Sequence, residues 1–325
     1  MAKFILPILL LSSFAPAQAA PRKVVYGSDN RREPFQANPT LARLARSTAA
    51  MVANRQIVNT GPGLCALDFE ESLETGQNVC PGERFSQQPI GAMCSGFLVG
   101  DDLLVTAGHC LLSLSQIGYP SAEAVCRGFS WVFGYGLDSA VRNPLRGRSA
   151  DVYRCRQVVV ARLNNTQDFA VIRLDRKVTG RAPLRFRASG KVADGANLAV
   201  IGHPSGLPTK IADGARVLHN RDRSVFGTNL DTFQGNSGSA VFNTASGEVE
   251  GILVRGRSDY RPSITGNANS CQVVNTPRSS RGSPKLRIGC RGRARAANSS
   301  LRGGPRGPSR LHWEPCPTLP ASSIR

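Results

Sequence analysis

The sequence predicts an all-β protein, folded as a barrel or a sandwich. Short apolar runs recur between turn residues, without a sustained helical period. The segment 95–110, SGFLVGDDLLVTAGHC, has the pattern of a hairpin with a Gly-Asp-Asp turn. Only residues 38–53, NPTLARLARSTAAMVA, have a spacing that suggests a helix. The expected strands lie at 97–99, 103–106, 131–133, 158–160, 169–174, 198–201, 240–242 and 251–254.

The first twenty residues have the composition of a secretion signal. Lys3 precedes an apolar run over residues 4–11, and the Ala-Gln-Ala sequence at 17–19 fits a signal-peptidase site. The run is too short to span a bilayer, and no other segment approaches the roughly 20 apolar residues required. We therefore expect residues 1–20 to be a signal peptide and the mature protein to be secreted, without a membrane span.

The nine cysteines also fit an oxidising compartment, where they can form disulfides. No pair has the Cys-x-x-Cys spacing of common zinc and redox sites, and we expect neither a metal nor a cofactor. Because nine is an odd number, at least one cysteine is expected to be free or paired with another chain.

Positive charge is concentrated near the end of the chain. Residues 278–325 contain eleven Lys and Arg and the single acid Glu314, which accounts for about half of the net charge of +19. The stretch is rich in Arg, Gly, Pro and Ser and has no apolar period, so we expect a disordered tail without which the rest of the chain folds. A polyanion-binding arm is the alternative. The only aromatic residue of the segment 278–325 is Trp313, so it lacks the aromatic side chains on which bases stack, and we do not expect nucleic acid to be a required partner.

A serine lies in a glycine-rich turn before an apolar strand, in DTFQGNSGSAVF at residues 231–242. Glycines allow the backbone to approach another group closely, so the turn could expose the Ser237 hydroxyl and direct backbone N–H groups at an oxyanion. Such a turn alone is usually an ordinary loop. A histidine that could serve as its base makes a catalytic role for Ser237 more plausible. His109 follows the strand 103–106 and adjoins Cys110, which can pair with Cys94 across the hairpin.

The base of such a site needs a carboxylate that orients it. Asp168 lies just ahead of the apolar strand 169–174, where it could be buried against His109. Three other aspartates are rivals on sequence alone, although they lie among charged or turn residues: Asp138, Asp151 and Asp175. The remaining histidines are expected to be structural or solvated, or to lie in the tail: His203, His219 and His312.

The segments VTAGHC, DFAVIRL and GNSGSAVF, in this order, resemble the His, Asp and Ser motifs of the trypsin/chymotrypsin-fold serine proteases. The Gly-Asn-Ser-Gly-Ser sequence resembles the bacterial trypsin-like branch near the glutamyl endopeptidases more closely than the animal trypsins, which have Gly-Asp-Ser-Gly-Gly there. The segments VVYGSDNR at 24–31 and IGHPSGLPTKIADGA at 201–215 resemble that branch as well. The resemblance covers roughly residues 24–275.

The resemblance implies two antiparallel six-stranded barrels packed side by side, within residues 21–180 and 181–277, with the site between them. Ser237 would be the nucleophile, His109 the general base and Asp168 the orienting acid, with the N–H groups of Gly235 and Ser237 as the oxyanion hole. The expected function is a monomeric, secreted serine endopeptidase acting on proteins or peptides. The alternatives are another acyl hydrolase, such as an esterase, and a non-catalytic polyanion-binding protein.

The resemblance also predicts a preference for cleavage after Arg or Lys. Asp231 lies six residues before Ser237, as does the carboxylate at the floor of the trypsin specificity pocket. Gly256 matches the glycine of the pocket wall, and Thr232 follows Asp231. The alternative is that Asp231 only closes a turn through Thr232. Leu253 stands where glutamyl endopeptidases have a histidine, so a preference for Glu is not expected.

Four disulfides are expected. The hairpin places Cys94 opposite Cys110, and Cys126 and Cys155 flank a strand-like segment and its return. Proximity in the sequence favours Cys65–Cys80 as the third pair, and Cys271–Cys290 as the fourth.

Overall fold

The computed structural model describes residues 25–114, 118–141, 143–256, 258–263 and 270–276, and three short strands at 286–289, 294–296 and 311–313. The expected signal peptide, Cys290 and most of the predicted tail lie outside the described residues. No helix within the described ranges is long and apolar enough to cross a membrane.

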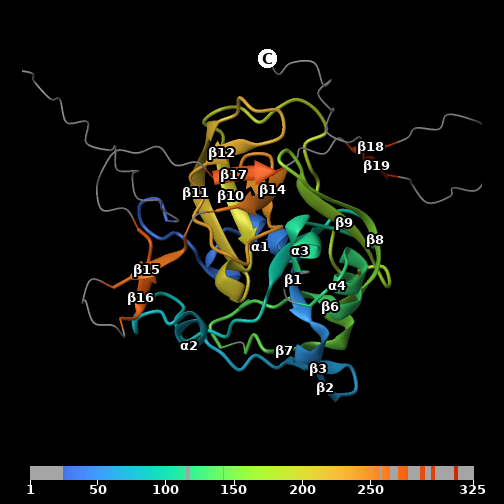
Figure 1. The fold of residues 1–325 in the computed structure, drawn as a ribbon, viewed down its shortest axis with the longest axis vertical. Coiled ribbons are helices and arrows are strands. Elements are labelled where there is room, and N and C mark those ends of the chain that lie inside the picture. Colours follow the sequence, from blue (N-terminus) through green and yellow to red (C-terminus); the bar gives the residue numbers. More distant parts are fainter. Residues whose placement is uncertain are drawn as a thin grey trace, which may run out of the picture.

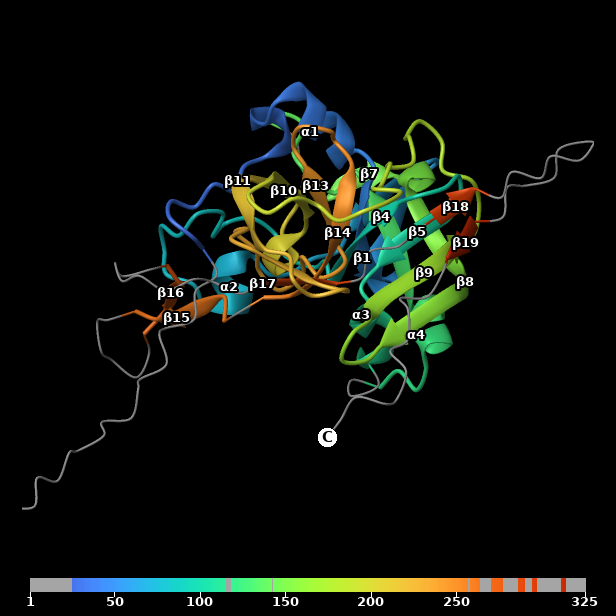
Figure 2. The same cartoon turned by 90° about the horizontal axis from the view of Figure 1, so that it is seen from above.

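Two closed six-stranded barrels lie side by side, as Figures 1 and 2 show from two directions. All of the strand pairs within each barrel are antiparallel. The expected fold, all-β with two antiparallel six-stranded barrels, is therefore confirmed. The first barrel contains, in spatial order, β1 (Thr48–Ala53), β4 (Cys94–Leu98), β5 (Leu103–Thr106), β9 (Asp168–Leu174), β8 (Val152–Leu163) and β6 (Phe129–Phe133).

The second barrel contains, in spatial order, β10 (Asn197–Gly202), β11 (Lys210–His219), β12 (Phe226–Thr228), β17 (Leu286–Gly289), β14 (Val249–Arg255) and β13 (Ala240–Asn243). Its order shows one correction to the expected domain limits. The strand β17 lies inside the segment 278–325, which the sequence predicted to be a disordered tail, and it pairs with both β12 and β14. The second barrel therefore does not end at residue 277.

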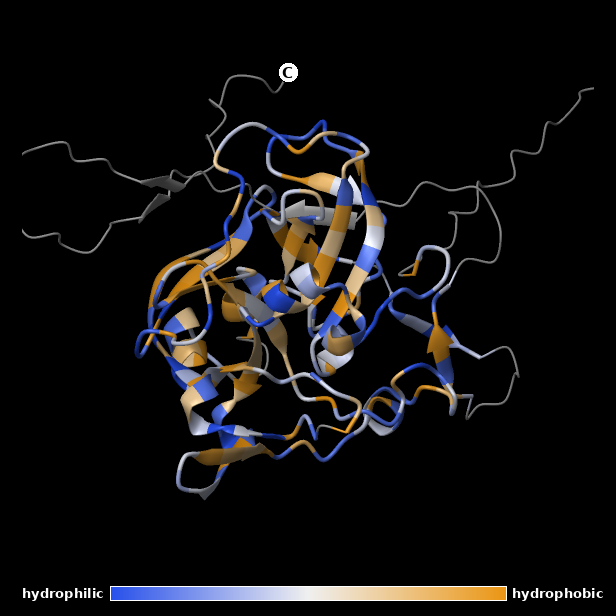
Figure 3. Ribbon diagram, turned by 180° about the vertical axis from the view of Figure 1, so that it is seen from behind, coloured by the Kyte–Doolittle hydropathy of each residue, from blue (hydrophilic) through white to orange (hydrophobic). Residues whose placement is uncertain are grey.

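The packing of the core explains why several strands have continuous apolar sequences and not an alternation of apolar and polar residues. In β10, Leu198 and Val200 lie in the core of the second barrel, whereas Ala199 and Ile201 belong to a cluster shared with the first barrel. Both faces of the strand are buried, so both sets of side chains must be apolar. Figure 3 shows hydrophobic residues, in orange, along the strands of the barrels.

The segment 38–53 is only partly helical, which corrects the expected helix there. The helix α1 (Pro39–Ala45) begins at Asn38, whose side chain accepts a hydrogen bond from the backbone N–H of Leu41, and the chain then enters β1. All six residues of β1 are buried, because one face packs in a cluster through Ala49 and Met51 and the other in a second cluster through Ala50 and Val52, while its edges pair with β4 and β6. The small apolar residues of this run fit a strand that is paired on both edges, and this tertiary pairing outweighs their helical spacing.

Short elements complete the described chain. They are the strands β2 (Ile57–Gly61), β3 (Leu64–Leu67), β7 (Arg146–Arg148), β15 (Tyr260–Pro262), β16 (Gln272–Val274), β18 (Ala294–Ala296) and β19 (Leu311–Trp313), and the helices α2 (Leu73–Gln77), α3 (His109–Leu112) and α4 (Ala122–Gly128). Single 3-10 turns occur at Pro34–Gln36, Asn54–Gln56, Ser149–Asp151 and Pro204–Gly206.

The described residues contain three disulfides, and two of them are the expected pairs Cys94–Cys110 and Cys126–Cys155. The third is Cys80–Cys271, so the expected pairs Cys65–Cys80 and Cys271–Cys290 are wrong. A backbone hydrogen bond from Cys80 to Gln272 brings the two distant segments together, which nearness in the sequence could not indicate. Cys65 is a free, buried thiol in β3, where burial raises its pKa.

Candidate active site

His109 and Asp168 lie side by side at the ends of paired strands. His109 begins α3, directly after β5, and Asp168 begins β9, which pairs with β5. The imidazole Nδ1 lies 3.0 Å from Asp168 Oδ2 and 3.1 Å from Oδ1, and the backbone N–H of His109 donates to Oδ1 at 3.0 Å. The Asp168 side chain is 6% exposed and that of His109 is 28% exposed, so a buried carboxylate orients an accessible imidazole.

Two of the three rival acids form ion pairs away from His109. Asp151 forms ion pairs with Arg148 and Arg181, and Asp175 forms one with Arg176. Of the residues singled out from the sequence, Asp168 is therefore the acid that meets His109.

A glycine allows the His109 loop to lie this close to β8 and β9. A Cβ atom on Gly108 would overlap the carbonyl oxygen of Arg162 and crowd the backbone nitrogen of Phe169. The disulfide between Cys94 and Cys110 fixes the other side of the loop. The imidazole thus projects from a backbone held on both sides.

Ser237 lies against the strands that carry His109. Its carbonyl accepts a 2.8 Å hydrogen bond from the N–H of Ser95 in β4. The next residue, Gly238, has a φ of +87°, and a Cβ atom there would overlap the Ser95 carbonyl and the Thr106 hydroxyl at the end of β5. The sequence of the turn thus allows the second barrel to approach the first at this point.

The backbone N–H groups in the serine turn fall into two sets. Those of Gln234, Asn236 and Gly238 donate hydrogen bonds to Asp259, Phe233 and Leu253, respectively. By contrast, the N–H groups of the expected oxyanion hole donate to no acceptor within the described part of the chain. These two groups are Gly235 N–H and Ser237 N–H, which alternate with the engaged ones. Gly235 has a φ of +86°, the left-handed region that glycine adopts readily.

The other described histidines have structural environments. His203 is fully buried, its Nδ1 lies 3.1 Å from the Leu207 carbonyl, and it stacks on the Tyr135 ring. Burial lowers the pKa of His203 to about 3, so its imidazole is neutral at physiological pH. His219 packs over Gly227. Both fit the expected structural role, while His312 lies in β19, for which only the backbone is described.

One group of side chains has the spacing of metal ligands, and it is not a metal site. Ligand-type atoms of Cys94, His109 and Cys110 lie within 4.8 Å of one another. Both sulfur atoms belong to the disulfide, so neither can supply the thiolate that binds a metal.

A pocket of about 320 Å³ opens beside Ser237. Two of the residues expected to bind substrate, Thr232 and Gly256, line it. Among its described lining residues the carboxylate is that of Asp259, which could not be predicted from the sequence because it lies in the charged stretch RGRSDY with no motif around it. The remaining lining residues are Phe233, Gln234, Leu253, Arg255 and Ser258.

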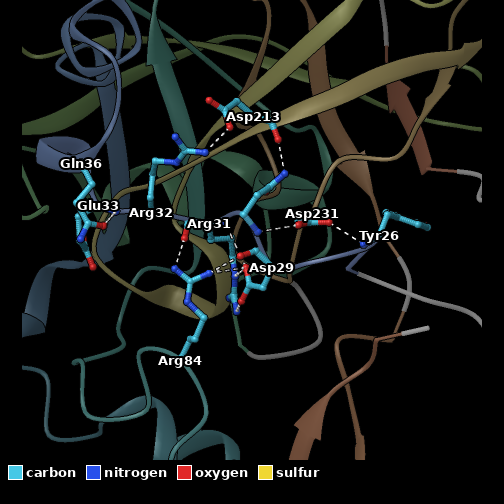
Figure 4. A network of polar contacts seen from close by, with 10 residues as sticks. Tyr26, Asp29, Arg31, Arg32, Glu33, Gln36, Arg84, Asp213 and Asp231 are labelled. Carbon is cyan, nitrogen blue, oxygen red and sulfur yellow. Dashed lines mark hydrogen bonds and ion pairs between the residues drawn. The ribbon is translucent and has the colours of Figure 1, made fainter. Parts of the chain in front are cut away.

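Asp231, the expected floor of the specificity pocket, does not line this pocket. Its side chain is turned to the N-terminal segment, where Oδ1 accepts a 2.8 Å hydrogen bond from the N–H of Tyr26 and Oδ2 accepts one at 3.2 Å from Asn30 (Figure 4). The residue is 1% exposed, and burial raises the pKa of its carboxyl to about 6. The spacing of six residues before the serine is therefore present, but the carboxylate performs a structural role.

The N-terminal segment supports the pocket from behind. The buried Arg31 is held by both carboxylate oxygens of Asp29, and its guanidinium lies 3.8 Å from the ring centroid of Phe233, a pocket residue. Arg84 donates to the carbonyl oxygens of Asp29 and Arg31 (Figure 4). A charged network thus connects residues 29–31 to the pocket wall.

One family model matches the chain. Residues 94–252 match the family model described as a trypsin-like peptidase domain. The resemblance to trypsin-like peptidases is thereby confirmed over these residues. A comparison with curated proteins found no match.

Solved structures of proteases are similar to the chain at low sequence identity. A Glu endopeptidase in complex with MPD is 19% identical, with 72% of this chain and 89% of that chain covered and a TM-score of 0.43. The active form of the Rv3671c protease from M. tuberculosis is 16% identical, with coverages of 81% and 89% and a TM-score of 0.39. A serine endoprotease from Yersinia pestis is 14% identical, with coverages of 73% and 61% and a TM-score of 0.39.

Proposed function

We propose that this protein is a serine endopeptidase that cleaves peptide bonds through an acyl-enzyme. The Ser237 hydroxyl attacks the carbonyl carbon, and His109 accepts its proton and returns it to the leaving amine. Asp168 keeps the imidazole in the required tautomer and stabilises the imidazolium that forms. The observation that carries the proposal is the 3.0 Å contact between His109 Nδ1 and the buried Asp168, next to Cys110, whose Sγ lies 3.8 Å from the Ser237 carbonyl oxygen.

In the proposed mechanism, the two free N–H groups of the serine turn stabilise the negative charge of the oxyanion. The carbonyl oxygen becomes negatively charged when Ser237 attacks, and the N–H groups of Gly235 and Ser237 would donate to it. One such donor contributes roughly 10²–10³ in rate. The Ser237 hydroxyl itself has no hydrogen-bond partner among the described residues, and catalytic hydrogen bonds are often longer in the absence of substrate.

An acyl hydrolase that prefers esters would use the same triad, so an endopeptidase and an esterase must be distinguished by comparing cleavage of a protein with cleavage of small esters. We expect the wild-type protein to cleave an unfolded protein at internal positions, and the Ser237→Ala variant to leave it intact. A folded wild type that hydrolyses only small esters would instead support the esterase alternative. If neither substrate is cleaved, the non-catalytic alternative, a polyanion-binding protein, gains support.

Secretion is part of the proposal and has independent support. Three disulfides are typical of proteins that mature in an oxidising compartment. Together with the signal-like N-terminus, they favour an extracellular or periplasmic protein that acts as a monomer on protein or peptide substrates. The mass of the secreted chain would test removal of residues 1–20.

For the substrate, we propose cleavage after Arg or Lys, recognised by Asp259. This side chain is half-buried in the pocket beside Ser237, and within the described part of the chain it accepts one hydrogen bond, from the Gln234 N–H at 2.7 Å. No ion pair of Asp259 is present among the described residues. A cationic side chain entering the pocket would therefore meet an unpaired carboxylate. Arg255 also lines the pocket, but it is exposed and its charge is screened by solvent.

Cleavage of a peptide library tests this substrate preference. We expect Asp259→Asn to reduce kcat/KM after Arg and Lys by at least about tenfold, the scale of one charge-assisted hydrogen bond. Cleavage after apolar residues should be retained. Ser258→Ala, which changes another lining residue without removing charge, is the matched control. Unchanged selectivity in a folded Asp259→Asn variant would refute the role of Asp259 while leaving the proposed triad intact.

A further inference from the structure

A second, larger hollow lies at the far end of the second barrel from the catalytic turn. Its volume is about 680 Å³, and it is lined by α1, by the connection between the barrels at 180–185 and by the turn at 244–247. Ser237 precedes β13 and the turn 244–247 follows it, so a strand separates the two sites. We call this hollow the arginine groove.

The charge of the arginine groove has one sign. Four arginines line it, namely Arg43, Arg46, Arg181 and Arg185. None of the described lining residues is an acid. Arg181 is already engaged, because it donates to Asp151 at 2.7 Å and to the Arg46 carbonyl at 2.8 Å. The other three are exposed, and no carboxylate within the described ranges forms an ion pair with them.

Nearby acids do not neutralise these three arginines. Asp151 pairs with Arg148 as well as with Arg181, and Glu250 accepts two hydrogen bonds from Arg187. Glu248 follows the turn but does not line the groove. A surplus of positive charge therefore remains in a concave site, where a bound anion would gain from several guanidinium groups at once.

The floor of the groove is apolar. Leu41 and Leu184 are buried beneath it, and Leu44 is half-buried beside Gly247. Pro183 is exposed on the wall. No aromatic side chain is present among the described lining residues, so nucleobases would find no stacking surface.

We propose that the arginine groove binds an extended polypeptide segment in which acidic residues alternate with apolar ones. An extended chain directs successive side chains to opposite sides, so it can place carboxylates on the arginines and apolar groups on Leu44 and Pro183. Arginine suits this role because its planar guanidinium binds a carboxylate through two parallel hydrogen bonds. This inference is independent of the proposed catalytic activity.

Fluorescence anisotropy on the full chain tests the proposal, with a labelled peptide that alternates Glu and Leu. The Ser237→Ala background keeps the peptide intact. Neutralising the three arginines without an ion pair, of which Arg46 also donates to the Gly180 carbonyl at 3.0 Å, should weaken binding by about tenfold or more, if each exposed pair contributes a few-fold. The groove variant carries Arg43→Gln, Arg46→Gln and Arg185→Gln.

A matched variant controls for net charge, including that of the basic C-terminal segment. It removes three exposed arginines outside the groove, and we expect it to change binding by less than about twofold. It carries Arg156→Gln, Arg162→Gln and Arg221→Gln. Equal loss of affinity in both variants would contradict the proposal, because binding would then depend on net charge alone.

Two further measurements keep the test decisive if the groove variant is unstable. Changing the same three arginines to Glu should create binding of a peptide that alternates Lys and Leu. In the wild type, bound Glu-Leu peptide should slow hydrogen exchange at 43–47 and 181–185. Absence of this protection would overturn the proposal. So would an oligonucleotide or a sulfated oligosaccharide that protects these segments when the peptide does not.

Discussion

The carboxylate of Asp231 accepts a 2.8 Å hydrogen bond from the backbone N–H of Tyr26, 205 residues away in the sequence. This contact attaches the N-terminal segment to the strand connection that precedes the nucleophile turn. The same carboxylate accepts from Asn30. A residue whose position in the sequence predicts substrate recognition therefore anchors the chain beneath the pocket.

Asp231→Ala should release the N-terminal segment without changing the residue after which the protein cleaves. The substitution leaves two backbone N–H groups without their acceptor, which costs about 1–3 kcal/mol of the free energy of unfolding. Hydrogen exchange at Tyr26 and Asn30 should become faster, and the thermal midpoint should fall. A changed cleavage preference with unchanged exchange at these two amides would contradict the structural role of Asp231.

The preference for basic substrates should depend on pH through Asp259. Burial raises the pKa of this carboxyl to about 6, whereas the Gln234 N–H and Arg31 act in the opposite direction. Below pH 6 the carboxyl is mostly protonated and neutral, and above pH 6 it is charged and attracts Arg or Lys. The ratio of kcat/KM after Arg to that after Leu should therefore rise about tenfold between pH 5 and pH 7.

Taking this ratio removes the titration of the general base, because His109 acts on both substrates. Asp259→Asn should make the ratio independent of pH. A ratio that stays flat in the wild type, or one that keeps its slope in the variant, would show that another group sets the preference.

Gly238→Ala should destabilise the protein more than a matched change elsewhere. Its φ of +87° strains any other residue, and the added Cβ would overlap the Ser95 carbonyl. We expect a loss of about 1–3 kcal/mol from the strain, with more from the overlap. Gly63→Ala is the control, because its φ is +72° and nothing lies within 4 Å of the added atom. Equal thermal midpoints for the two variants would argue against close packing at the serine turn.

Ending the chain at residue 277 should damage the second barrel. The truncation removes β17 and exposes the edges of β12 and β14, which the strand joins. A chain ending at residue 290 retains β17 and is the matched control. We expect the shorter chain to unfold at a lower temperature or to aggregate, whereas equal stability would show that the barrel does not need β17.

The strands could be predicted where buried runs and turns alternate in the sequence. Seven of the eight expected runs lie within strands of the two barrels, and the eighth, 97–99, extends one residue beyond the end of β4 at Leu98. The prediction missed β11 and β12, on which no expected run falls. It also failed for β1, whose helical spacing yields to pairing with β4 and β6, and for β17, whose sequence LRIG contains no continuous apolar run. Pairing between distant segments decides both cases, and local patterns do not report it.

The site could be predicted in part for a similar reason. His109, Asp168 and Ser237 lie in motifs that combine a strand end with a turn, so each has a local signature. Asp259 has none, since its place in the pocket depends on the course of the chain after β14. Cys271 likewise pairs with Cys80 only because two remote segments form backbone hydrogen bonds.

Labelling with a fluorophosphonate tests the central claim, that His109 and Asp168 activate Ser237, most directly. We predict a single adduct on Ser237 in the folded wild type, located by peptide mapping, and far slower labelling in His109→Ala and Asp168→Asn. Ser237→Ala should give no adduct. A folded wild-type protein that takes up no label, or takes it up at a different residue, would contradict the account.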